Sequence, residues 1–287
     1  MGGWPFGEYP AGGLERLGPH VTAFYAESFP VSNSAIVRGT DAALVFDANF
    51  AQEGLKLRRA VEDAQGPPLR ELVLSHYHDD HTLGAMHLAP PALVRSRTYT
   101  RERISSLASD PGAAGVPEGV HVVVPDSVVE EQEVIDLGGG VLVRLLPEPE
   151  AHTRGDLWAF VEPDGVALCG DLWFTGCEPY FGSGSVAGSS SAIDRLRDAQ
   201  ANIYLPGHGR AGTLAPRGQE PVQRMCAWLL EQTSAEMARG LQGDDLAAAV
   251  RAAFDERHDI RFPLAIPGFL EEGVVAAVRD LSGSINH

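Results

Sequence analysis

Three histidines and two aspartates fall within six consecutive residues, in the segment Ser-His-Tyr-His-Asp-Asp-His that begins at Ser75. Imidazole and carboxylate groups bind zinc, iron and manganese. His76 and His78 lie two residues apart, so on an extended segment they share a face and can converge on one metal, while Asp80 and His81 can reach a neighbouring position. No Cys-x-x-Cys pair accompanies the cluster, which disfavours a closed structural zinc site. The cluster therefore predicts an open site with two metal centres.

Three more residues with metal-binding side chains lie further along the chain, each after a predicted strand. His152 occurs in Glu-Ala-His-Thr-Arg-Gly-Asp, Asp171 closes Ala-Leu-Cys-Gly-Asp, and His208 occurs in Pro-Gly-His-Gly. A solvated polar loop would explain the histidine cluster alone, but it would not explain these later residues. Polar side chains that repeatedly end strands predict a site assembled at the edge of a sheet.

The order of these residues, from about residue 21 to residue 210, resembles the metallo-β-lactamase-fold metallohydrolases, and most of all their glyoxalase II and lactonase branch. The signature of that superfamily is His-x-His-x-Asp-His followed by single His, Asp and His motifs, and all of these positions are filled here. The resemblance implies an α/β (α+β) fold, an αββα sandwich with the metal site at one edge of two sheets. It implies two sets of three ligands and one bridging carboxylate, which are His76, His78 and His152, then Asp80, His81 and His208, and Asp171 as the bridge.

The same resemblance indicates the chemistry. Two zinc ions, with iron or manganese as alternatives, would share a water, lower its pKa from about 15.7 toward about 7 and so provide a hydroxide nucleophile at neutral pH. Asp80 would orient the hydroxide and move protons as the catalytic acid–base group. Asp47 matches a family position beside the site, where it would orient a ligating imidazole; a simple turn aspartate is the alternative. The implied activity is zinc-dependent hydrolysis of an acyl bond.

The substrate is less closely defined than the site. Asp171 stands where one β-lactamase subclass has cysteine, which disfavours a β-lactam hydrolase but leaves it as an alternative. Glyoxalase II relatives hold glutathione through basic residues, but Lys56 is the only lysine here, and lactonases carry a tyrosine where this chain has Phe174. We therefore expect a small-molecule thioester or lactone, uncharged or weakly polar. An iron-dependent oxidoreductase of the persulfide dioxygenase type is the other alternative, because such enzymes keep these histidines.

Aromatic residues after the bridging aspartate are candidates for substrate contact, with core packing as the other interpretation. We expect Trp173, Phe174 and Tyr180, together with Phe181, to line the pocket and to favour an apolar acyl portion. Residues 182–191 are rich in glycine and serine, and we expect them to form a lid over that pocket.

The elements that must carry these residues can be located from hydrophobic patterns and turn signals. Strands are expected at residues 35–37, 42–46, 72–74, 120–124, 141–146, 157–161, 166–169 and 203–205. Helices are expected at residues 53–64, at 193–199 behind an N-cap at 189–191, and around 221–237, 245–254 and 271–281. This order predicts a catalytic domain over residues 1–215 and a helical extension packed on it over residues 216–287.

The overall charge limits the partners. The 287-residue chain has 22 basic and 39 acidic side chains, a net charge of −17, which disfavours nucleic acid and leaves a small-molecule substrate. No run approaches the roughly 20 apolar residues of a membrane span, and no polybasic patch would bind a membrane surface.

The first residues lack a secretory signal pattern and the cysteine count is odd, so we expect a cytoplasmic protein. A homodimer, if formed, would use residues 1–20 or the helical tail.

Overall fold

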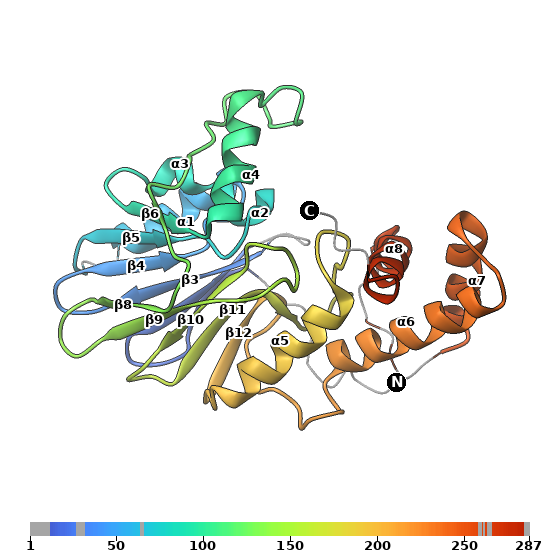
Figure 1. Ribbon diagram of the computed structural model, residues 1–287. Helices are drawn as coiled ribbons and strands as arrows, with labels where there is room; N and C mark the ends of the chain where they lie inside the picture. Colours follow the sequence, from blue (N-terminus) through green and yellow to red (C-terminus); the bar gives the residue numbers. More distant parts are fainter. Residues whose placement is uncertain are drawn as a thin grey trace.

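Two β-sheets lie face to face in the computed structural model, which describes residues 12–26, 32–63, 66–257, 260, 262 and 266–283. The first sheet has the order β1 (Gly13–Arg16), β2 (Val21–Tyr25), β3 (Asn33–Arg38), β4 (Ala43–Phe46), β5 (Leu69–Val73), β6 (Leu93–Ser96) and β7 (Ser127–Val128). The second sheet has the order β12 (Ile203–His208), β11 (Val166–Phe174), β10 (Leu157–Val161), β9 (Leu142–Pro147) and β8 (Glu133–Asp136). Strands β4 to β7 run parallel to one another, and so do β11 and β12 (Figure 1).

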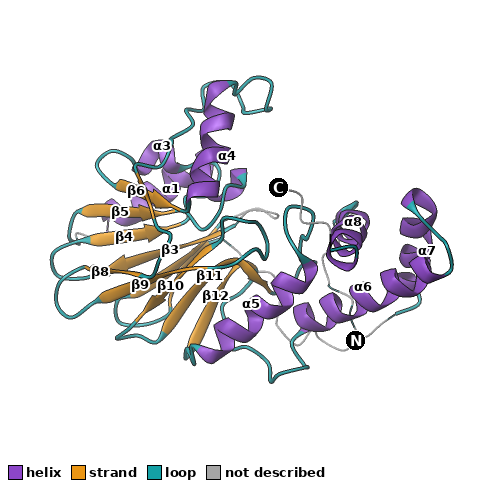
Figure 2. Ribbon diagram, in the orientation of Figure 1, coloured by secondary structure: helices purple, strands orange, loops and turns teal. Residues whose placement is uncertain are grey.

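Helices cover the outer face of each sheet (Figure 2). The first sheet carries α1 (Ala51–Asp63), α2 (Asp79–Thr82), α3 (Ala85–Leu88) and α4 (Thr98–Ser109). The second sheet carries α5 (Val186–Asp198), and beyond it lie α6 (Pro221–Ala238), α7 (Gly243–Asp255) and α8 (Phe269–Leu281). Three hydrophobic clusters fill the spaces between these layers. The expected αββα sandwich with a C-terminal helical part is therefore confirmed.

The inner strands are apolar along their whole length because both of their faces are covered. In β3, Ala35 and Val37 belong to the cluster between the sheets, whereas Ile36 belongs to the cluster beneath the first helical layer. Successive side chains of a strand point to opposite faces, so a strand between two layers needs a continuous apolar run. This is why residues 35–37 and 42–46 could be recognised as strands, and they pair as the antiparallel hairpin β3–β4.

Most expected elements are present, but three expectations differ from the structure. Residues 120–124 form no strand; Val122 instead packs as irregular chain into the cluster of the first helical layer, so burial rather than pairing explains its apolar character. The strand expected at 166–169 continues to Phe174. The serines at 189–191 lie inside α5, whose N-cap is Ser185, because the Ser185 side chain accepts a hydrogen bond from the Gly188 amide.

The C-terminal helices continue the core of the second sheet. Leu229 of α6 and Val274 of α8 lie in the same hydrophobic cluster as Ile193 of α5. The indole of Trp173 in β11 also donates a hydrogen bond to Glu220, the residue before α6. The division at residues 215 and 216 stays a prediction, and residues 1–11 of the expected dimer arm and Ala64 at the end of the expected first helix lie outside the described residues.

Candidate metal centre and the cavity above it

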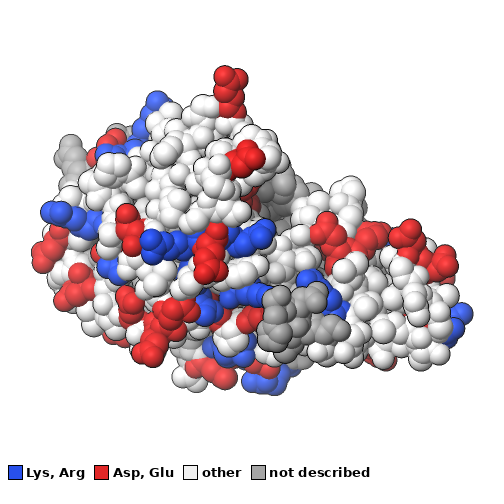
Figure 3. Space-filling model, turned by 45° about the horizontal axis from the view of Figure 1, so that its top comes forward, with Lys and Arg blue, Asp and Glu red and all other residues white. Residues whose placement is uncertain are grey.

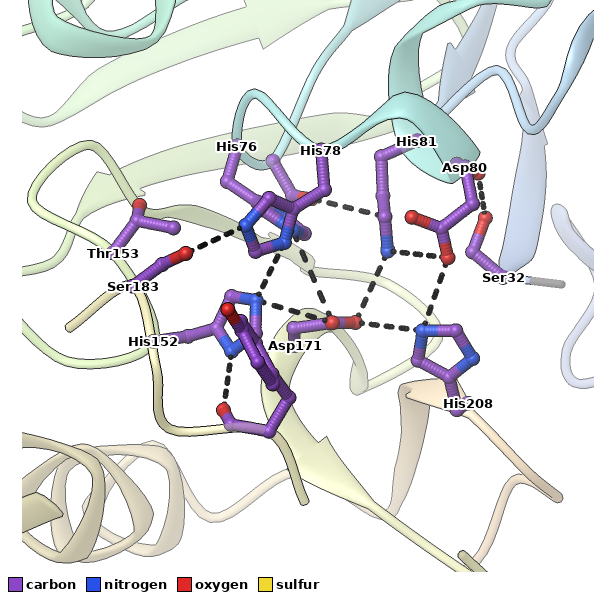
Figure 4. A network of polar contacts seen from close by, with 12 residues as sticks. Ser32, His76, His78, Asp80, His81, His152, Thr153, Asp171, Ser183 and His208 are labelled. Atoms are coloured by element: carbon purple, nitrogen blue, oxygen red, sulfur yellow. Dashed lines mark hydrogen bonds and ion pairs between the residues drawn. The ribbon is translucent and has the colours of Figure 1, made fainter. Parts of the chain in front are cut away.

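Four segments bring the candidate ligands to one edge of the two sheets. The segment after β5 carries His76 and His78, and the short helix α2 begins there and carries Asp80 and His81. The second sheet provides Asp171 in β11, His208 at the end of β12 and His152 in the turn between β9 and β10. Figure 4 shows these side chains around one centre. Residues far apart in sequence therefore meet because β5 and the second sheet end at the same edge.

The first group consists of His76, His78, His152 and Asp171. His78 Nδ1 lies 2.9 Å from His76 Nε2 and 3.0 Å from His152 Nε2. Asp171 Oδ2 lies 3.3 Å from His152 Nε2 and 3.9 Å from His76 Nε2. One donor atom of each residue thus faces a common point, and these atoms lie within 4.8 Å of one another.

The second group consists of Asp80, His81 and His208. Asp80 Oδ2 lies 3.2 Å from His208 Nε2 and 3.6 Å from His81 Nε2. The other oxygen of Asp171, Oδ1, lies 3.1 Å from His81 Nε2 and 3.5 Å from His208 Nε2. Asp171 therefore presents one carboxylate oxygen to each group, which is the arrangement expected of a bridging ligand (Figure 4).

The donor set fits divalent cations. Within the described residues, His81 Nε2 and Asp171 Oδ1 are buried and make no hydrogen bond. Buried polar atoms without partners are costly, and a cation between them would satisfy both. The donors are imidazole nitrogens and carboxylate oxygens without a thiolate, a combination that suits zinc, iron or manganese. The site therefore supports metal use.

The two groups differ in their electrostatics. Burial lowers the pKa of His78 to about 3 and lowers the pKa of His76 and His152, so these imidazoles are neutral and able to coordinate. Burial acts in the same direction on His208, but the carboxylates of Asp171 and Asp80 outweigh it and raise its pKa to about 9. The carboxylates around the second group therefore create a negative potential, which also favours a bound cation.

Two close approaches depend on backbone shape. Asp47 adopts a positive φ of 61° at the end of β4, and its Oδ2 lies 2.8 Å from His81 Nδ1. The other oxygen of Asp47 accepts a hydrogen bond from the Ser75 amide at 2.7 Å. Asp47 thus holds the ring of His81, the role expected for it. At Gly207 a Cβ atom would overlap Asp171 Oδ1, so β12 can run beside the carboxylate only with glycine there.

Two further contacts orient the first group, and no sequence signal pointed to them. Ser183 Oγ lies 3.0 Å from His78 Nε2, the ring nitrogen that faces away from the centre. His152 Nδ1 lies 3.0 Å from the carbonyl oxygen of Tyr180. Hydrogen bonds to the outer nitrogen fix the orientation of a ligating imidazole. Both partners lie in one loop that precedes α5, and only the folded chain brings this loop to the histidines.

A cavity of about 470 Å³ opens above the two groups. Its lining combines the ligands with aromatic, aliphatic and acidic side chains, which are Phe50, His78, Asp80, His152, Asp171, Phe174, Cys177, Glu178, Tyr180, His208, Ile266, Phe269 and Glu272. The Phe174 ring stacks on His208 with centroids 5.5 Å apart, and the Tyr180 ring lies 5.7 Å from His78. The cavity therefore places apolar walls beside the candidate metal centre.

Some of the aromatic residues that were expected at the pocket line the cavity, and others are packed in the core. Phe174 and Tyr180 line the cavity, but Trp173 and Phe181 do not. Trp173 is 1% exposed and packs in the hydrophobic cluster of the second sheet, because alternate residues of β11 point to opposite sides. The expected substrate contact of Trp173 is therefore not supported. Phe50, Phe269 and Glu272 were missed, since they come from segments distant from the ligand motifs. Glu178 was missed although it lies only seven residues after Asp171.

The lid expected at residues 182–191 also differs from the structure. Residues from Val186 onward form the first turns of α5. Asp280 of α8 holds this end of the helix, because its Oδ2 accepts hydrogen bonds from the Ala187 amide and from Ser185 Oγ. Arg279 donates to the Gly182 carbonyl oxygen. The segment is thus fastened to α8, and none of its residues lines the cavity, so the structure does not support the expected lid.

The chain belongs to the metallo-beta-lactamase superfamily, whose family model matches residues 29–208. Over 196 residues it is 29% identical to a hydroxyacylglutathione hydrolase from Acidiphilium cryptum (strain JF-5), a match that covers 68% of this chain and 65% of the relative. The chain thus spans slightly less than two thirds of that relative's length. This relative agrees with the likeness to glyoxalase II seen in the sequence.

Solved structures of low sequence identity share the fold. The stereoselective inverting sec-alkylsulfatase Pisa1 from Pseudomonas sp. matches with a TM-score of 0.69 at 15% identity, over 95% of this chain and 50% of that one. The DIM-1 metallo-beta-lactamase matches with a TM-score of 0.61 at 16% identity, over 77% of this chain and 99% of that one. At such identities the similarity concerns the architecture.

Proposed function

We propose that the protein is a zinc-dependent hydrolase that binds two Zn²⁺ ions and cleaves the acyl bond of a small-molecule thioester or lactone. The observation that carries this proposal is the position of Asp171, whose two oxygens face two separate groups of donors. When bound, two such cations would acidify a shared water and supply hydroxide at neutral pH. Hydrolysis then adds the hydroxyl to the acyl carbon and a proton to the leaving thiolate or alkoxide, which yields an acid and a thiol or alcohol.

Residues of the chain itself would orient and protonate the substrate. Burial alone would raise the pKa of Asp80, but His81 and His208 outweigh it and lower that pKa. Asp80 is therefore ionised at neutral pH, and it lines the cavity, so it can accept a proton and pass it to the leaving group. Phe174 and Tyr180 would contact an apolar acyl portion.

Several observations bear on the substrate. The relative named above is a hydroxyacylglutathione hydrolase, which supports a thioester. However, neither lysine nor arginine occurs among the described residues that line the cavity, and glutathione carries carboxylates. We therefore favour another thioester or a lactone over glutathione conjugates. The β-lactam and persulfide alternatives lack a specific observation in their favour.

Two further features bear on the location of the enzyme and on the class of its substrate. No helix among the described residues is long and apolar enough to cross a membrane, and the net charge of −17 raises the potential against polyanions. We propose a cytoplasmic enzyme that acts on a small molecule rather than on nucleic acid or a membrane.

The first test is metal analysis of the protein purified without added metal. We expect about two zinc equivalents per chain, and about one or fewer in Asp171→Ala, because that variant loses a carboxylate that would neutralise both ions. A stable value of one iron per chain would favour the dioxygenase alternative. Two retained metals with full activity in Asp171→Ala would show that Asp171 does not bridge.

The second test is a substrate panel for the zinc-loaded protein. It contains acyl thioesters, γ-lactones, a chromogenic cephalosporin and a phosphodiester. We expect the highest kcat/KM with a thioester or lactone. A kcat/KM more than tenfold higher for the cephalosporin or the phosphodiester would contradict the proposed substrate class.

A further inference from the structure

Glu178 is a buried carboxylate that takes no part in the proposed metal chemistry. It lines the cavity, yet its side chain is almost fully shielded, with 2% of the residue exposed. Its Oε1 is buried and has no hydrogen-bond partner among the described residues. A buried carboxylate without a full set of partners is energetically unfavourable. Such a group at the wall of a cavity is placed to receive a hydrogen-bond donor from a ligand.

The position of Glu178 within the cavity follows from its neighbours. The carboxylate accepts a hydrogen bond from the backbone of Ile266, and the Phe269 amide donates to the Ile266 carbonyl oxygen. Glu178 therefore lies against the segment that leads into α8. The ring of Phe269 packs on Tyr180 with centroids 4.9 Å apart, and Tyr180 in turn borders His78. Aromatic side chains thus connect the candidate metal centre with the wall that carries Glu178.

The charges around this wall are mainly negative. Glu272 also lines the cavity and accepts a 2.6 Å hydrogen bond from the Tyr180 hydroxyl. Arg251 is the cation that acts on Glu178, but its guanidinium already makes two hydrogen bonds to Glu271, at 2.9 and 2.8 Å. Figure 3 shows acidic side chains gathered on the helical part of the molecule, at the right of the view.

From this geometry we infer that Glu178 forms a subsite for an ammonium group at the far end of the substrate. The inference rests on the proposed hydrolase function and defines its substrate as an acyl compound with an amine-bearing chain. An ammonium group supplies the donor that Oε1 lacks, and it is also attracted to the faces of aromatic rings such as those of Phe269 and Tyr180. This refines the earlier expectation of an uncharged substrate.

The same arrangement disfavours anionic ends. Above about pH 7, where Glu178 is ionised, a substrate carboxylate next to Glu178 and Glu272 would meet two like charges without a described lysine or arginine at the cavity wall, and like-charge contacts in a desolvated site are strongly unfavourable. Selection between an amine and a carboxylate would then arise from this wall rather than from the metal centre.

The test measures binding of two probes that differ only at one end. Hexylammonium and 1-hexanol have the same apolar chain, and neither contains an acyl bond. Isothermal titration calorimetry of the full-length protein at pH 8, where Glu178 is ionised and the amine still protonated, is expected to give a dissociation constant at least tenfold lower for hexylammonium. In Glu178→Gln this preference should fall to less than threefold, because the amide keeps the shape but not the charge. The control Glu231→Gln removes an exposed charge on α6 and should keep the preference.

Equal affinities of the wild-type protein for the two probes would overturn the inference, and this comparison needs no variant to fold. An unchanged preference in Glu178→Gln would overturn it as well. A kinetic comparison links the subsite to turnover: a 6-aminohexanoyl thioester should have a KM at least tenfold below that of the hexanoyl thioester. If no thioester or lactone is hydrolysed but hexylammonium still binds through Glu178, the proposed hydrolase function fails and the ammonium subsite stands.

Discussion

At the scale of single residues, the candidate site depends on where each carboxylate lies. Asp79 and Asp80 are adjacent in sequence, but only Asp80 belongs to a group of potential ligands. Asp80 points toward His81 and His208 in Figure 4, whereas Asp79 lines a separate depression with Tyr77 and Arg103. Neighbouring residues of the same type thus have different surroundings, because both lie in α2, where successive side chains point about 100° apart around the helix axis.

This difference gives a matched pair of variants. Asp80→Asn should lower kcat by at least ~10²-fold, the scale of a lost acid–base group. The ion that we propose for His76, His78 and His152 should stay bound. Asp79→Asn should lower kcat by less than about threefold. Steady-state kinetics combined with metal analysis checks both expectations. Equal losses in the two variants would mean that the motif has been read in the wrong register.

A pH effect is expected from Glu178. Burial raises the pKa of this carboxyl from 4.5 to about 7, so the folded protein holds the proton to a higher pH than the unfolded chain does. The contribution of Glu178 to the free energy of unfolding therefore decreases as the pH rises from about 4.5 to about 7 and then stays constant. Glu178→Gln lacks this dependence. Between pH 5 and pH 8 its stability relative to wild type should rise by about 2 kcal/mol.

Urea denaturation at pH 5, 6, 7 and 8 measures this change. Glu231→Gln serves as the control, because its exposed side chain should leave the pH dependence of unfolding as in the wild type. Parallel stability curves for Glu178→Gln and wild type would show that burial does not perturb Glu178.

At the scale of elements, helix α5 illustrates how tertiary contacts choose a helix start. Serines occur at 185, 189, 190 and 191, and the later run resembles an N-cap signal. The structure uses Ser185, because Asp280 of α8 binds both Ser185 Oγ and the Ala187 amide there. A carboxylate at a helix N-terminus also interacts favourably with the helix dipole. The start of α5 is thus decided by a helix almost a hundred residues further along the chain.

Ser185→Ala should lower the free energy of unfolding by about 1 kcal/mol, the usual cost of a lost N-cap. Ser191→Ala should change it by less than about 0.5 kcal/mol, since Ser191 is exposed and its hydroxyl only donates to the Ala187 carbonyl oxygen within the helix. Chemical denaturation of both variants measures the difference. A larger loss in Ser191→Ala than in Ser185→Ala would contradict the assigned helix start.

At the scale of the whole molecule, the candidate metal centre joins the two sheets. His76, His78, Asp80 and His81 follow β5 of the first sheet, whereas Asp171 and His208 belong to β11 and β12 of the second. Ions held between them would act as cross-links that the unfolded chain lacks, so metal binding would stabilise the folded state.

Removal of metal by a chelator should therefore lower Tm by at least about 5 °C, and addition of zinc should restore it. Differential scanning calorimetry of the protein before and after chelation checks this effect. The loss should be smaller in Asp171→Ala, which is expected to bind less metal from the start. An unchanged Tm after complete metal removal would mean that the ions do not connect the sheets.

The sequence alone determined the features that depend on local patterns. The motif from His76 to His81, the later His152, Asp171 and His208, and the apolar runs of β3, β4, β10 and β12 could all be recognised, because residue type and spacing carry that information along a short stretch of chain. The family and the αββα fold followed from their order. Even the division of the ligands into two groups agrees with the arrangement in space.

Only the tertiary structure decided which side chains surround the site. Trp173 turned inward to the core while Phe174 faced the cavity, and Ser183 reached His78. Glu178 came to the cavity wall with one oxygen, Oε1, that makes no hydrogen bond within the described residues. These outcomes depend on contacts between segments that are distant in sequence, such as α8 against the start of α5. A local pattern contains no record of such contacts, because packing between layers selects the face, the helix start and the partners of each residue.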